Sequence, residues 1–499
     1  MSKNFYITTP IYYPSAKPHM GHAYSSIAAD VIARFKKIEG FNVFFLTGTD
    51  EHGMKIQKAA EKIKKHPQLF CDEISKTFID LTKTLNLSNN DFIRTTESRH
   101  KKSVIEFWKL LDKNDQIYLS KYAGWYSISD EAYYSEDEIE DIDGKKISKV
   151  SGNNVEWMEE ESFFFKLSEW QKPLLKFYED NPNFIQPESR KNEVISFVSN
   201  GLKDLSISRT TFDWGIPVPN NNKHIMYVWL DALTNYISAT NFFENKNIFW
   251  PADVHIIGKD ILRFHAVYWP AFLMAAKLPL PKKIFGHGWI LSGEEKMSKS
   301  KGNILDPIEL IDKFGADELR YYLMKDVVFG LDGSINLDNF KNTINDLANN
   351  IGNLSNRIFT ILEKNYDCKV PDVTAGYTIN ENLLVNIKDF TNLINNFEIH
   401  NYLKKIHSYS SSLNKYVNDN EPWNKKINSE QNIKNILYSS LIGLKNVFVL
   451  LYPIMPSKSI NFLKNINIKE SDLKLSLIDD KFKIKEQLNK PPILFKKYE

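Results

Sequence analysis

The chain has 499 residues, and its 64 Lys and Arg residues nearly balance its 62 Asp and Glu residues, which leaves a net charge of +2. Hydrophobic residues at 42%, charged residues at 25% and only 20 Gly and 20 Pro exclude a disordered, collagenous or low-complexity chain. The length suggests about three domains. A charge so close to zero excludes attraction of nucleic acid by the molecule as a whole, so a polyanion must bind to local patches.

Cysteine content and the amino terminus narrow the class of protein further. The two cysteines, Cys71 and Cys368, lie far apart in the sequence, which excludes a disulfide framework and a zinc site built from cysteines. The first residues show no basic segment followed by a long apolar stretch. The densest apolar run, Val447 to Tyr452, is much shorter than the roughly 20 residues that span a bilayer. We therefore expect a cytoplasmic protein.

The first elements predict a βαβ unit. Phe5 to Thr9 is aromatic and β-branched, which predicts a buried strand that ends at Pro10. From His22 onward apolar residues recur every three or four positions until Gly40, which predicts an amphipathic helix with a glycine stop. A second strand is expected at Val43 to Leu46. The loop between strand and helix would then open at the carboxyl edge of the sheet, where doubly wound folds bind ligands.

The rest of the chain divides by its pattern. Helical spacing continues over 54–115, short alternating aromatic pieces follow, and apolar strands are predicted again at 226–230 and 254–258. Beyond about 335 the pattern is helical, with an interhelix loop near 371–376. We predict an α/β fold in which a Rossmann-like parallel sheet is split by a β-rich connective insertion and is followed by an α-helical bundle. The predicted ranges are 1–115 and 211–335 for the two halves of the Rossmann catalytic domain, 116–210 for the insertion and 336–499 for the bundle.

A pair of histidines, His19 and His22, stands at the predicted strand-to-helix junction. The N–H groups at a helix start attract anions, and two imidazoles can donate to phosphate oxygens that gain charge during a transfer. Gly21 lets a nucleotide ring or a phosphate approach the backbone closely. The alternative for the isolated motif is a capped helix with surface histidines.

A cluster of lysines, Lys296-Met297-Ser298-Lys299-Ser300-Lys301, lies between Gly293 and Gly302, which predicts a loop that can move. Three nearby cations repel one another, and a polyphosphate would neutralise them and be clamped as it reacts. The alternative is a solvated surface loop.

Together, these motifs resemble those of the class I aminoacyl-tRNA synthetases, whose two signatures are written HIGH and KMSKS. The second is present letter for letter, and the first reads HMGH. Within the class, the chain is most similar to the methionyl-tRNA synthetase family, and the similarity extends over essentially the whole chain. The matching blocks are Pro10 to His22, Thr47 to Gly53, Tyr227 to Ala232, Gly258 to Ile261, His265, Trp269-Pro270 and the KMSKS loop.

The resemblance implies a set of site residues. The amino-acid pocket would consist of Ile11, Tyr13, Asp50, Trp229, Ala232, Tyr236, Ile261 and His265. Such residues suit methionine, which needs an apolar slot with sulfur–aromatic contact, and Asp50 would hold the substrate ammonium by a charge-assisted bond. ATP would be bound by His19, Gly21, His22, Gly258, Asp260, Lys296, Ser298 and Lys299, of which His19, His22, Lys296 and Lys299 are the expected catalytic residues. Leu233 departs from the proline of some relatives.

The predicted helical bundle carries the residues implied for tRNA recognition. Asn353 and Arg357 are four positions apart, and hence lie on one helix face, while Trp423 offers a plane on which a base can stack. In the family these positions match the residues that read the CAU anticodon. From the residue alone, Trp423 would be an ordinary core side chain.

The resemblance also implies cofactors and partners. The expected substrates are ATP with Mg²⁺, L-methionine and tRNA(Met), the expected enzyme is a methionine–tRNA ligase, and no metal ligand is expected. Many relatives carry a zinc knuckle in the insertion, whereas 116–210 contains no cysteine, so a zinc-free form is expected. A monomer is expected because the chain ends soon after the helical region. With a net charge of only +2, the basic residues should gather in a track from the KMSKS loop toward Arg357 and Trp423.

Two other functions fit part of the sequence. A His-x-Gly-His nucleotidylyltransferase acting on a small phosphate ester would leave the helical third of the chain unused. A noncatalytic, synthetase-like tRNA-binding protein would be expected to have lost motif residues, yet His19, His22, Lys296 and Lys299 all remain. Charging of tRNA with methionine separates the first alternative from the ligase, and adenylate formation separates the second.

Overall fold

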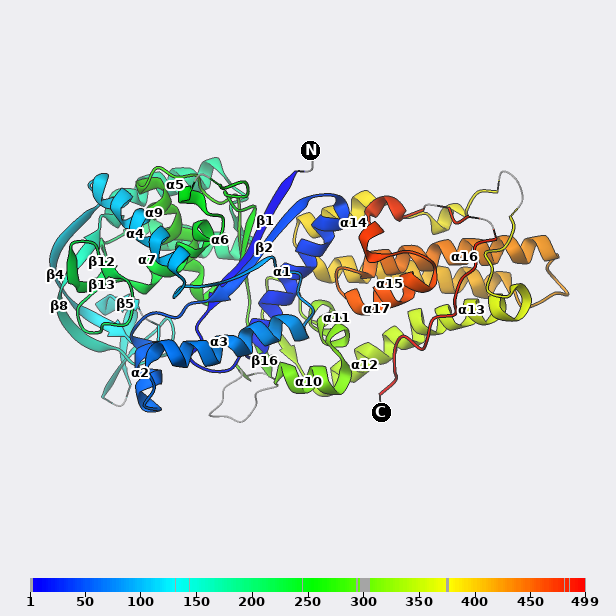
Figure 1. Cartoon of the computed structure of the whole chain (residues 1–499), viewed down its shortest axis with the longest axis horizontal. Helices are drawn as coiled ribbons and strands as arrows, with labels where there is room; N and C mark the ends of the chain where they lie inside the picture. The colour runs from blue at the N-terminus through cyan, green and yellow to red at the C-terminus, as the bar shows by residue number, and fades with distance from the viewer. Residues whose placement is uncertain are drawn as a thin grey trace.

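A six-stranded parallel sheet forms the centre of the α/β part (Figure 1). Its strand order is β3-β2-β1-β14-β15-β9, and every pair is parallel. The order reverses between β1 and β14, so the carboxyl ends of these two strands frame the crevice in which doubly wound folds bind ligands. The strands are β1 (Asn4–Tyr12), β2 (Asn42–Thr49), β3 (Asp91–Arg94), β9 (Ile185–Gln186), β14 (Val254–Gly258) and β15 (Ile284–His287).

The computed structural model describes residues 3–130, 132–142, 144–244, 246–292, 295–296, 306–373, 377–479, 481–483 and 485–498. In these residues the molecule is elongated, with the α/β part at one end and the long helices of the carboxyl-terminal region at the other (Figure 1).

The first strand and helix follow the predicted pattern with two differences. Strand β1 continues through Pro10, because the ladder between β1 and β2 has a register shift between Thr8 and Ile11, where the missing N–H of proline is tolerated. Helix α1 (Met20–Glu39) begins two residues before His22 and ends, as predicted, at Gly40, whose φ of 101° is left-handed.

Three helices and one unpredicted strand fill 54–115. Strand β3 was missed because its four residues, Asp91–Arg94, are too few and too polar to stand out between helical patterns. The helices are α2 (Met54–Lys62), α3 (Pro67–Thr84) and α4 (Ser98–Lys113).

The segment 116–210 is β-rich only in its first half. Strands β4 (Ile117–Ser127), β5 (Ala132–Tyr134), β8 (Glu156–Phe165) and β10 (Leu205–Ser206) form an antiparallel sheet, and β6 (Ile139–Ile142) pairs with β7 (Lys145–Ser148). Its second half holds α5 (Gln171–Asp180) and α6 (Glu188–Ser199), and between them β9 returns to the central sheet beside β15. The segment is thus β-rich, as predicted, and it also contains two helices that the prediction did not include.

The predicted strand at 226–230 is also wrong. Met226 ends β13 (Asn221–Met226), and the following apolar residues form helix α7 (Val228–Leu233), which is buried on all sides. A continuous apolar run cannot distinguish a buried strand from a buried helix by periodicity alone. The other strands here are β11 (Ser208–Arg209), β12 (Pro217–Val218), β16 (Ile290–Ser292), β17 (Glu295–Lys296) and β18 (Gly333–Ile335). The helices are α8 (Asn235–Ser238), the π-helix Phe264–Tyr268, α9 (Trp269–Ala275), α10 (Pro307–Phe314) and α11 (Ala316–Asp326).

The region beyond 336 is helical, as predicted. Its elements are α12 (Leu337–Leu347), the π-helix Ala348–Gly352, α13 (Asn353–Tyr366), α14 (Ile387–Asn395), α15 (Ile399–Asn420), α16 (Glu430–Leu451) and α17 (Pro456–Asn465). Of the expected loop, 371–373 is irregular, and 374–376 lies outside the described residues. Helix α16 is long and apolar enough to cross a membrane, but 89% of its apolar window is buried inside the protein, which is typical of a core helix.

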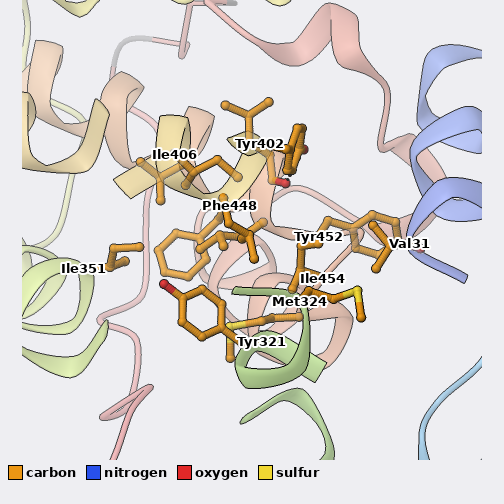
Figure 2. Packing of buried hydrophobic residues seen from close by; sticks show 14 of the residues in the cluster. Val31, Tyr321, Met324, Ile351, Tyr402, Ile406, Phe448, Tyr452 and Ile454 are labelled. Carbon is orange, nitrogen blue, oxygen red and sulfur yellow. Dashed lines mark hydrogen bonds between the residues drawn. The ribbon is translucent and has the colours of Figure 1, made fainter. Parts of the chain in front are cut away.

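The two faces of the central sheet pack into different hydrophobic cores. Successive residues of a strand point to opposite faces, so Tyr6 joins one core and Ile7 the other. The core on the Ile7 face includes α1 and continues into the carboxyl-terminal helices. Figure 2 shows this continuity: Val31 of α1 lies beside Tyr452 and Ile454, which follow α16. Helix α1 is thus shared between the nucleotide fold and the helical region.

Candidate active site

The two histidines of the HMGH motif cap helix α1 reciprocally. The His19 Nδ1 accepts the backbone N–H of Gly21 at 3.1 Å, and the His22 Nδ1 accepts the backbone N–H of His19 at 3.0 Å. The two rings lie with their centroids 3.8 Å apart. A Cβ on Gly21 would lie 3.0 Å from the His19 ring, so glycine is needed for this close arrangement.

The capping bonds determine which ring nitrogens point outward as donors. Because both Nδ1 atoms accept hydrogen bonds, the neutral rings carry their protons on Nε2. Burial, with a further contribution from His19, lowers the pKa of His22 well below its usual range. At neutral pH His22 is therefore a neutral imidazole whose Nε2–H can donate to a ligand.

The start of α1 differs in one respect from the anion site that the sequence predicts. The Gly21 N–H and the His19 N–H are used within the cap, so they are not directed at a ligand. The Nε2–H groups of the two rings, rather than these backbone N–H groups, are the donors that the capping bonds do not use. Both readings of the isolated motif, a capped helix and a pair of phosphate donors, are compatible with this geometry.

Most of the predicted amino-acid pocket forms one aromatic cluster behind the HMGH loop. Trp229 lies edge to face with Tyr13, at a centroid distance of 6.4 Å, and stacks on Phe264 at 3.8 Å. The Trp229 ring is also 6.1 Å from that of His265. The Trp229 Nε1 is buried and has no hydrogen-bond partner in the described part of the chain, which leaves a donor for a bound ligand.

Hydrogen bonds fix the polar end of this cluster. The carbonyl of Ile261 can only accept, so the His265 Nδ1, 3.0 Å away, carries the proton. The Tyr236 hydroxyl then donates to the His265 Nε2 at 2.7 Å. Burial lowers the pKa of His265 to about 4 and raises the pKa of Tyr236, so both groups are neutral at pH 7.

The three remaining predicted pocket residues come from neighbouring elements. Ile11 lies on β1 opposite Gly48 of β2, and Asp50 follows the end of β2, where its N–H donates to the carbonyl of Tyr12 at 2.9 Å. Asp50 is buried, and its charge contributes to the raised pKa of Tyr236, which puts it beside the cluster. Ala232 is buried on α7, one turn after Trp229. Leu233, the departure from relatives, is buried on the same helix.

The predicted nucleotide residues on the other side of the crevice follow β14. Gly258 ends this strand, and a Cβ at that position would lie 2.6 Å from a carboxylate oxygen of the exposed Asp260. Because β14 pairs directly with β1, Gly258 and Asp260 stand across the switch point from His19 and His22.

Sequence reasoning missed several residues at this crevice. His287, at the end of β15, binds the Ser25 Oγ of α1 through its Nε2 at 2.7 Å, and its Nδ1 binds the Gly288 carbonyl. Lys259 is held by both oxygens of Asp332 at 2.7 Å and lies 3.9 Å from the centre of the Trp289 ring. The sequence signals, a histidine at a strand end and a lysine beside Asp260, were present but not distinctive.

Of the KMSKS residues, Lys296 ends the short strand β17, which pairs with β16. Ser298 and Lys299 lie outside the described residues. Strand β16 in turn pairs with β18 and follows β15, so the loop departs from the carboxyl side of the central sheet.

Of the predicted anticodon residues, Asn353 and Arg357 lie on the first turns of α13, and Trp423 lies between α15 and α16. The Arg357 guanidinium lies 5.1 Å from the centre of the Trp423 ring and donates to the Asn418 side chain at 2.7 Å. The Trp423 side chain is 49% exposed, which is unlike the core role expected from the residue alone. Asn353 is exposed one turn before Arg357 and lines a cavity of about 490 Å³ with residues of the carboxyl-terminal segment.

In the insertion, Asp130 organises the turn region where relatives were expected to hold zinc. Its carboxylate accepts hydrogen bonds from the Tyr134 hydroxyl at 2.9 Å, the Ser151 hydroxyl and the Asn153 amide at 2.6 Å. Glu131 lies outside the described residues. No group of three or more His, Cys, Asp or Glu side chains suited to a metal ion occurs in the parts of the chain that the structure describes.

Comparisons with known proteins agree with this arrangement. The sequence profile of the family "tRNA synthetases class I (M)" matches residues 5–359. A methionine–tRNA ligase of Rickettsia conorii is 49% identical over 512 aligned residues, which cover all of both chains. A methionine–tRNA ligase of Bacillus subtilis is 46% identical, with 95% of this chain and 74% of that protein covered.

Solved structures show the same similarity in three dimensions. The methionyl-tRNA synthetase of Mycobacterium tuberculosis in complex with methionyl-adenylate matches with a TM-score of 0.95 at 39% identity, with 99% of both chains covered. The free form of the same enzyme matches with a TM-score of 0.88 at 37% identity, covering 100% of this chain and 99% of that chain. The backbone described above therefore superimposes better on the adenylate-bound form than on the free form.

Proposed function

The chain belongs to the class I tRNA synthetases (M), and we propose that it is a methionine–tRNA ligase that activates L-methionine with ATP and transfers it to tRNA. The observation that carries the proposal is the switch-point crevice. It joins the HMGH histidines to an aromatic pocket, in a chain that matches methionine–tRNA ligases along its whole length. Neither the nucleotidylyltransferase nor the noncatalytic alternative is favoured by any of these observations.

In the first step the methionine carboxylate attacks the α-phosphate of ATP in line, and pyrophosphate leaves. The carboxylate is already ionised, so the protein need not supply a base; it must position the reactants and stabilise developing charge. We assign this stabilisation to the Nε2–H groups of His19 and His22 and to Lys296 and Lys299 of the KMSKS loop. The neutral state of His22 suits a hydrogen-bond donor of this kind. Magnesium enters with ATP and neutralises part of the phosphate charge.

We assign methionine binding to the aromatic cluster. Asp50 would bind the substrate ammonium, and Trp229, Tyr13 and Ile261 would surround the thioether chain. The Tyr236 hydroxyl donates to His265, and burial keeps the His265 ring neutral. The end of the methionine slot would therefore carry no charge that could attract the polar side chain of a competing amino acid. Ile11, Ala232 and Tyr236 complete the slot, and Gly21, Gly258, Asp260 and Ser298 would bind ATP.

In the second step the 2′-hydroxyl of the terminal adenosine of tRNA attacks methionyl-adenylate, and AMP leaves. We propose that the tRNA carries a CAU anticodon, which Asn353, Arg357 and Trp423 would read. The exposed Trp423 and the guanidinium beside it support this proposal, because unstacked bases bind to aromatic and guanidinium planes.

Three further properties belong to the proposal. The insertion would fold without zinc, which the oxygen-rich partners of Asp130 support, since zinc prefers Cys and His ligands. The protein would be a monomer, and it would act in the cytoplasm.

The activity is tested by methionine-dependent exchange between ATP and labelled pyrophosphate, followed by charging of a CAU-anticodon tRNA. In the variant Lys299→Ala we expect the exchange rate to fall on the order of 10²–10³. The control is Lys313→Ala, which removes a lysine charge from the exposed last turn of α10 and should leave the exchange rate unchanged. Exchange that does not depend on methionine would overturn the proposed function.

The anticodon assignment has its own test. We expect Trp423→Ala to reduce charging of the CAU-anticodon tRNA about 10- to 100-fold, because stacking contributes about 1–3 kcal/mol per base. Pyrophosphate exchange, which needs no tRNA, should stay at the wild-type rate in the same preparation. Unchanged charging by this variant would remove Trp423 from the recognition site.

A further inference from the structure

A chain of buried polar side chains lies directly behind the aromatic cluster and takes no part in the mechanism above. The Asp231 carboxylate binds the His52 Nδ1 at 2.6 Å with one oxygen and the His100 Nε2 at 2.7 Å with the other. The His100 Nδ1 continues to the Ser238 hydroxyl at 3.1 Å. All four side chains are at most 2% exposed. We call these residues, His52, His100, Asp231 and Ser238, the imidazole–carboxylate chain.

Three members of the imidazole–carboxylate chain lie on segments that carry predicted pocket residues. His52 lies two residues after Asp50, in the loop that follows β2. Asp231 lies on α7, two residues after Trp229 and one before Ala232. Ser238 lies on α8, two residues after Tyr236. His100 comes from α4, which contributes no pocket residue, so it acts as an external anchor for the other three.

The charge of its members explains why the imidazole–carboxylate chain can be buried. A buried carboxylate is costly unless hydrogen bonds and opposite charge compensate it. Burial alone would raise the pKa of Asp231, but the two histidines hold it at about 2, so the carboxylate is ionised at neutral pH. Both oxygens then accept N–H groups, and the three segments are joined by bonds stronger than those between neutral partners.

We propose that Asp231, with His52 and His100, is a positioning residue for methionine binding: it fixes the loop of Asp50 against the helices of Trp229 and Tyr236. Asp50 must face the substrate ammonium while Trp229 faces its side chain, and these residues come from segments far apart in sequence. Hydrogen bonds of Asp50 and Glu51 hold this loop to Tyr12 and Thr95, and the bond from His52 to Asp231 ties it to α7, the helix that carries Trp229. The inference rests on the proposed function.

The test is Asp231→Asn, in which one oxygen becomes an NH₂ group that cannot accept from a ring N–H. We expect the KM for methionine in pyrophosphate exchange to rise about 10- to 100-fold, since hydrogen bonds to a charged group are lost. The KM for ATP should change less than about threefold, because the proposed phosphate donors, the HMGH histidines and the KMSKS lysines, lie outside the segments that Asp231 joins. Selectivity for methionine over norleucine, its isostere, should also fall, since a loosened slot no longer discriminates by shape.

A matched variant separates positioning from general destabilisation. His224 is another buried histidine, and it lies on β13 rather than in the pocket. It is bonded to the Ser208 hydroxyl at 2.9 Å and to Glu161 at 3.3 Å. His224→Gln should lower thermal stability without changing the KM for methionine or the norleucine ratio. If His224→Gln changes the KM for methionine and the norleucine ratio as strongly as Asp231→Asn does, the effect is structural and the positioning role is wrong.

Other results for Asp231→Asn and for the wild type also decide between the inference and the proposed function. If Asp231→Asn does not fold, His52→Gln and His100→Gln each remove one arm of the chain, and each should raise the KM for methionine at least severalfold. A folded Asp231→Asn protein with the wild-type KM for methionine and norleucine ratio would overturn the inference while leaving the proposed function intact. Wild-type protein without methionine-dependent exchange would instead overturn the proposed function.

Discussion

At the scale of single residues, the HMGH motif combines two roles that sequence reasoning treated as alternatives. His19 and His22 use Nδ1 to cap α1, and we propose their Nε2–H groups as the donors to phosphate. The sequence predicted the residues and their chemistry, because both follow from residue type and spacing. It could not predict that the cap would consume the backbone N–H groups, because that depends on the rotamers of the two rings.

If His22 both caps α1 and donates to the transferring phosphate, its replacement by alanine should lower the rate of exchange. His22→Ala should lower the rate of methionine-dependent pyrophosphate exchange on the order of 10²–10³, because one donor to the transferring phosphate is lost. His66 is a suitable control, since its Nδ1 caps α3 in the same way, with the Gln68 N–H at 3.2 Å, on another helix. His66→Ala should cost about 1 kcal/mol of stability and leave exchange unchanged. Equal losses of exchange in the two variants would mean that only capping matters.

A second residue-scale prediction concerns pH. The pKa of His265 is about 4 in the folded protein, below its ordinary value of 6.5, so the unfolded chain binds more protons between these two values. Stability contributed by this residue is fully present above pH 6.5 and is lost as pH falls toward 4. Between pH 7 and pH 5 the loss should be about 2 kcal/mol. Denaturant unfolding at both pH values should show a smaller loss in His265→Gln than in the wild type. An identical pH dependence in both proteins would contradict a buried, neutral His265.

At the scale of elements, prediction succeeded where a pattern had one meaning and failed where it had two. Helix α1 has a clear period and a glycine stop, and it was found within two residues of its start. The apolar run after Tyr227 fits a strand or a buried helix equally well, and only the surrounding core makes it α7. The return of β9 to the central sheet depends on a long-range pairing with β15 that no local pattern encodes.

The turn region around Asp130 gives an element-scale prediction. Because hydroxyl and amide groups satisfy its carboxylate, chelation of metal with EDTA should leave the melting temperature unchanged, and purified protein should contain no stoichiometric zinc by elemental analysis. Asp130→Ala should destabilise the insertion by about 1–2 kcal/mol, since the partly buried Tyr134 and Asn153 lose their acceptor. Asp141→Ala, which removes an exposed carboxylate bonded to the Gly144 N–H, is the control and should cost less. A zinc-dependent melting temperature would refute the zinc-free fold.

At the scale of the whole molecule, a buried group of charges joins the nucleotide fold to the helical region. Asp30 of α1 binds Arg34 at 2.8 Å and Arg320 of α11 at 2.7 Å. Arg320 also donates to the carbonyls of Pro453 and Ile454, at 2.8 Å and 2.7 Å, between α16 and α17. Burial alone would raise the pKa of Asp30, but the two arginines hold it below its ordinary value. Sequence reasoning did not find this group, because Arg320 and the carbonyls of 453–454 lie hundreds of residues from Asp30 and Arg34.

Breaking this group of buried charges should lower the stability of the folded protein. Arg320→Met removes one of the two guanidinium partners of the buried Asp30 and the donor to the carbonyls of Pro453 and Ile454, so the free energy of unfolding should fall by about 3–5 kcal/mol. Arg99→Met removes a partly exposed guanidinium that binds Asp91, and it should cost about 1 kcal/mol or less. Urea unfolding of the two variants beside the wild type gives the comparison. Similar losses in both would mean that burial of the charges contributes little.

The sharing of helix α1 between two parts of the molecule bears on how the chain folds. One face of the helix belongs to the same core as α11, α15 and α16, so removing the helical region would expose a continuous apolar surface on the catalytic half. The two parts are distinct in shape (Figure 1) but not independent in energy. Heating should therefore melt the chain in a single cooperative transition, and a fragment cut before α12 should aggregate instead of forming a smaller, working enzyme.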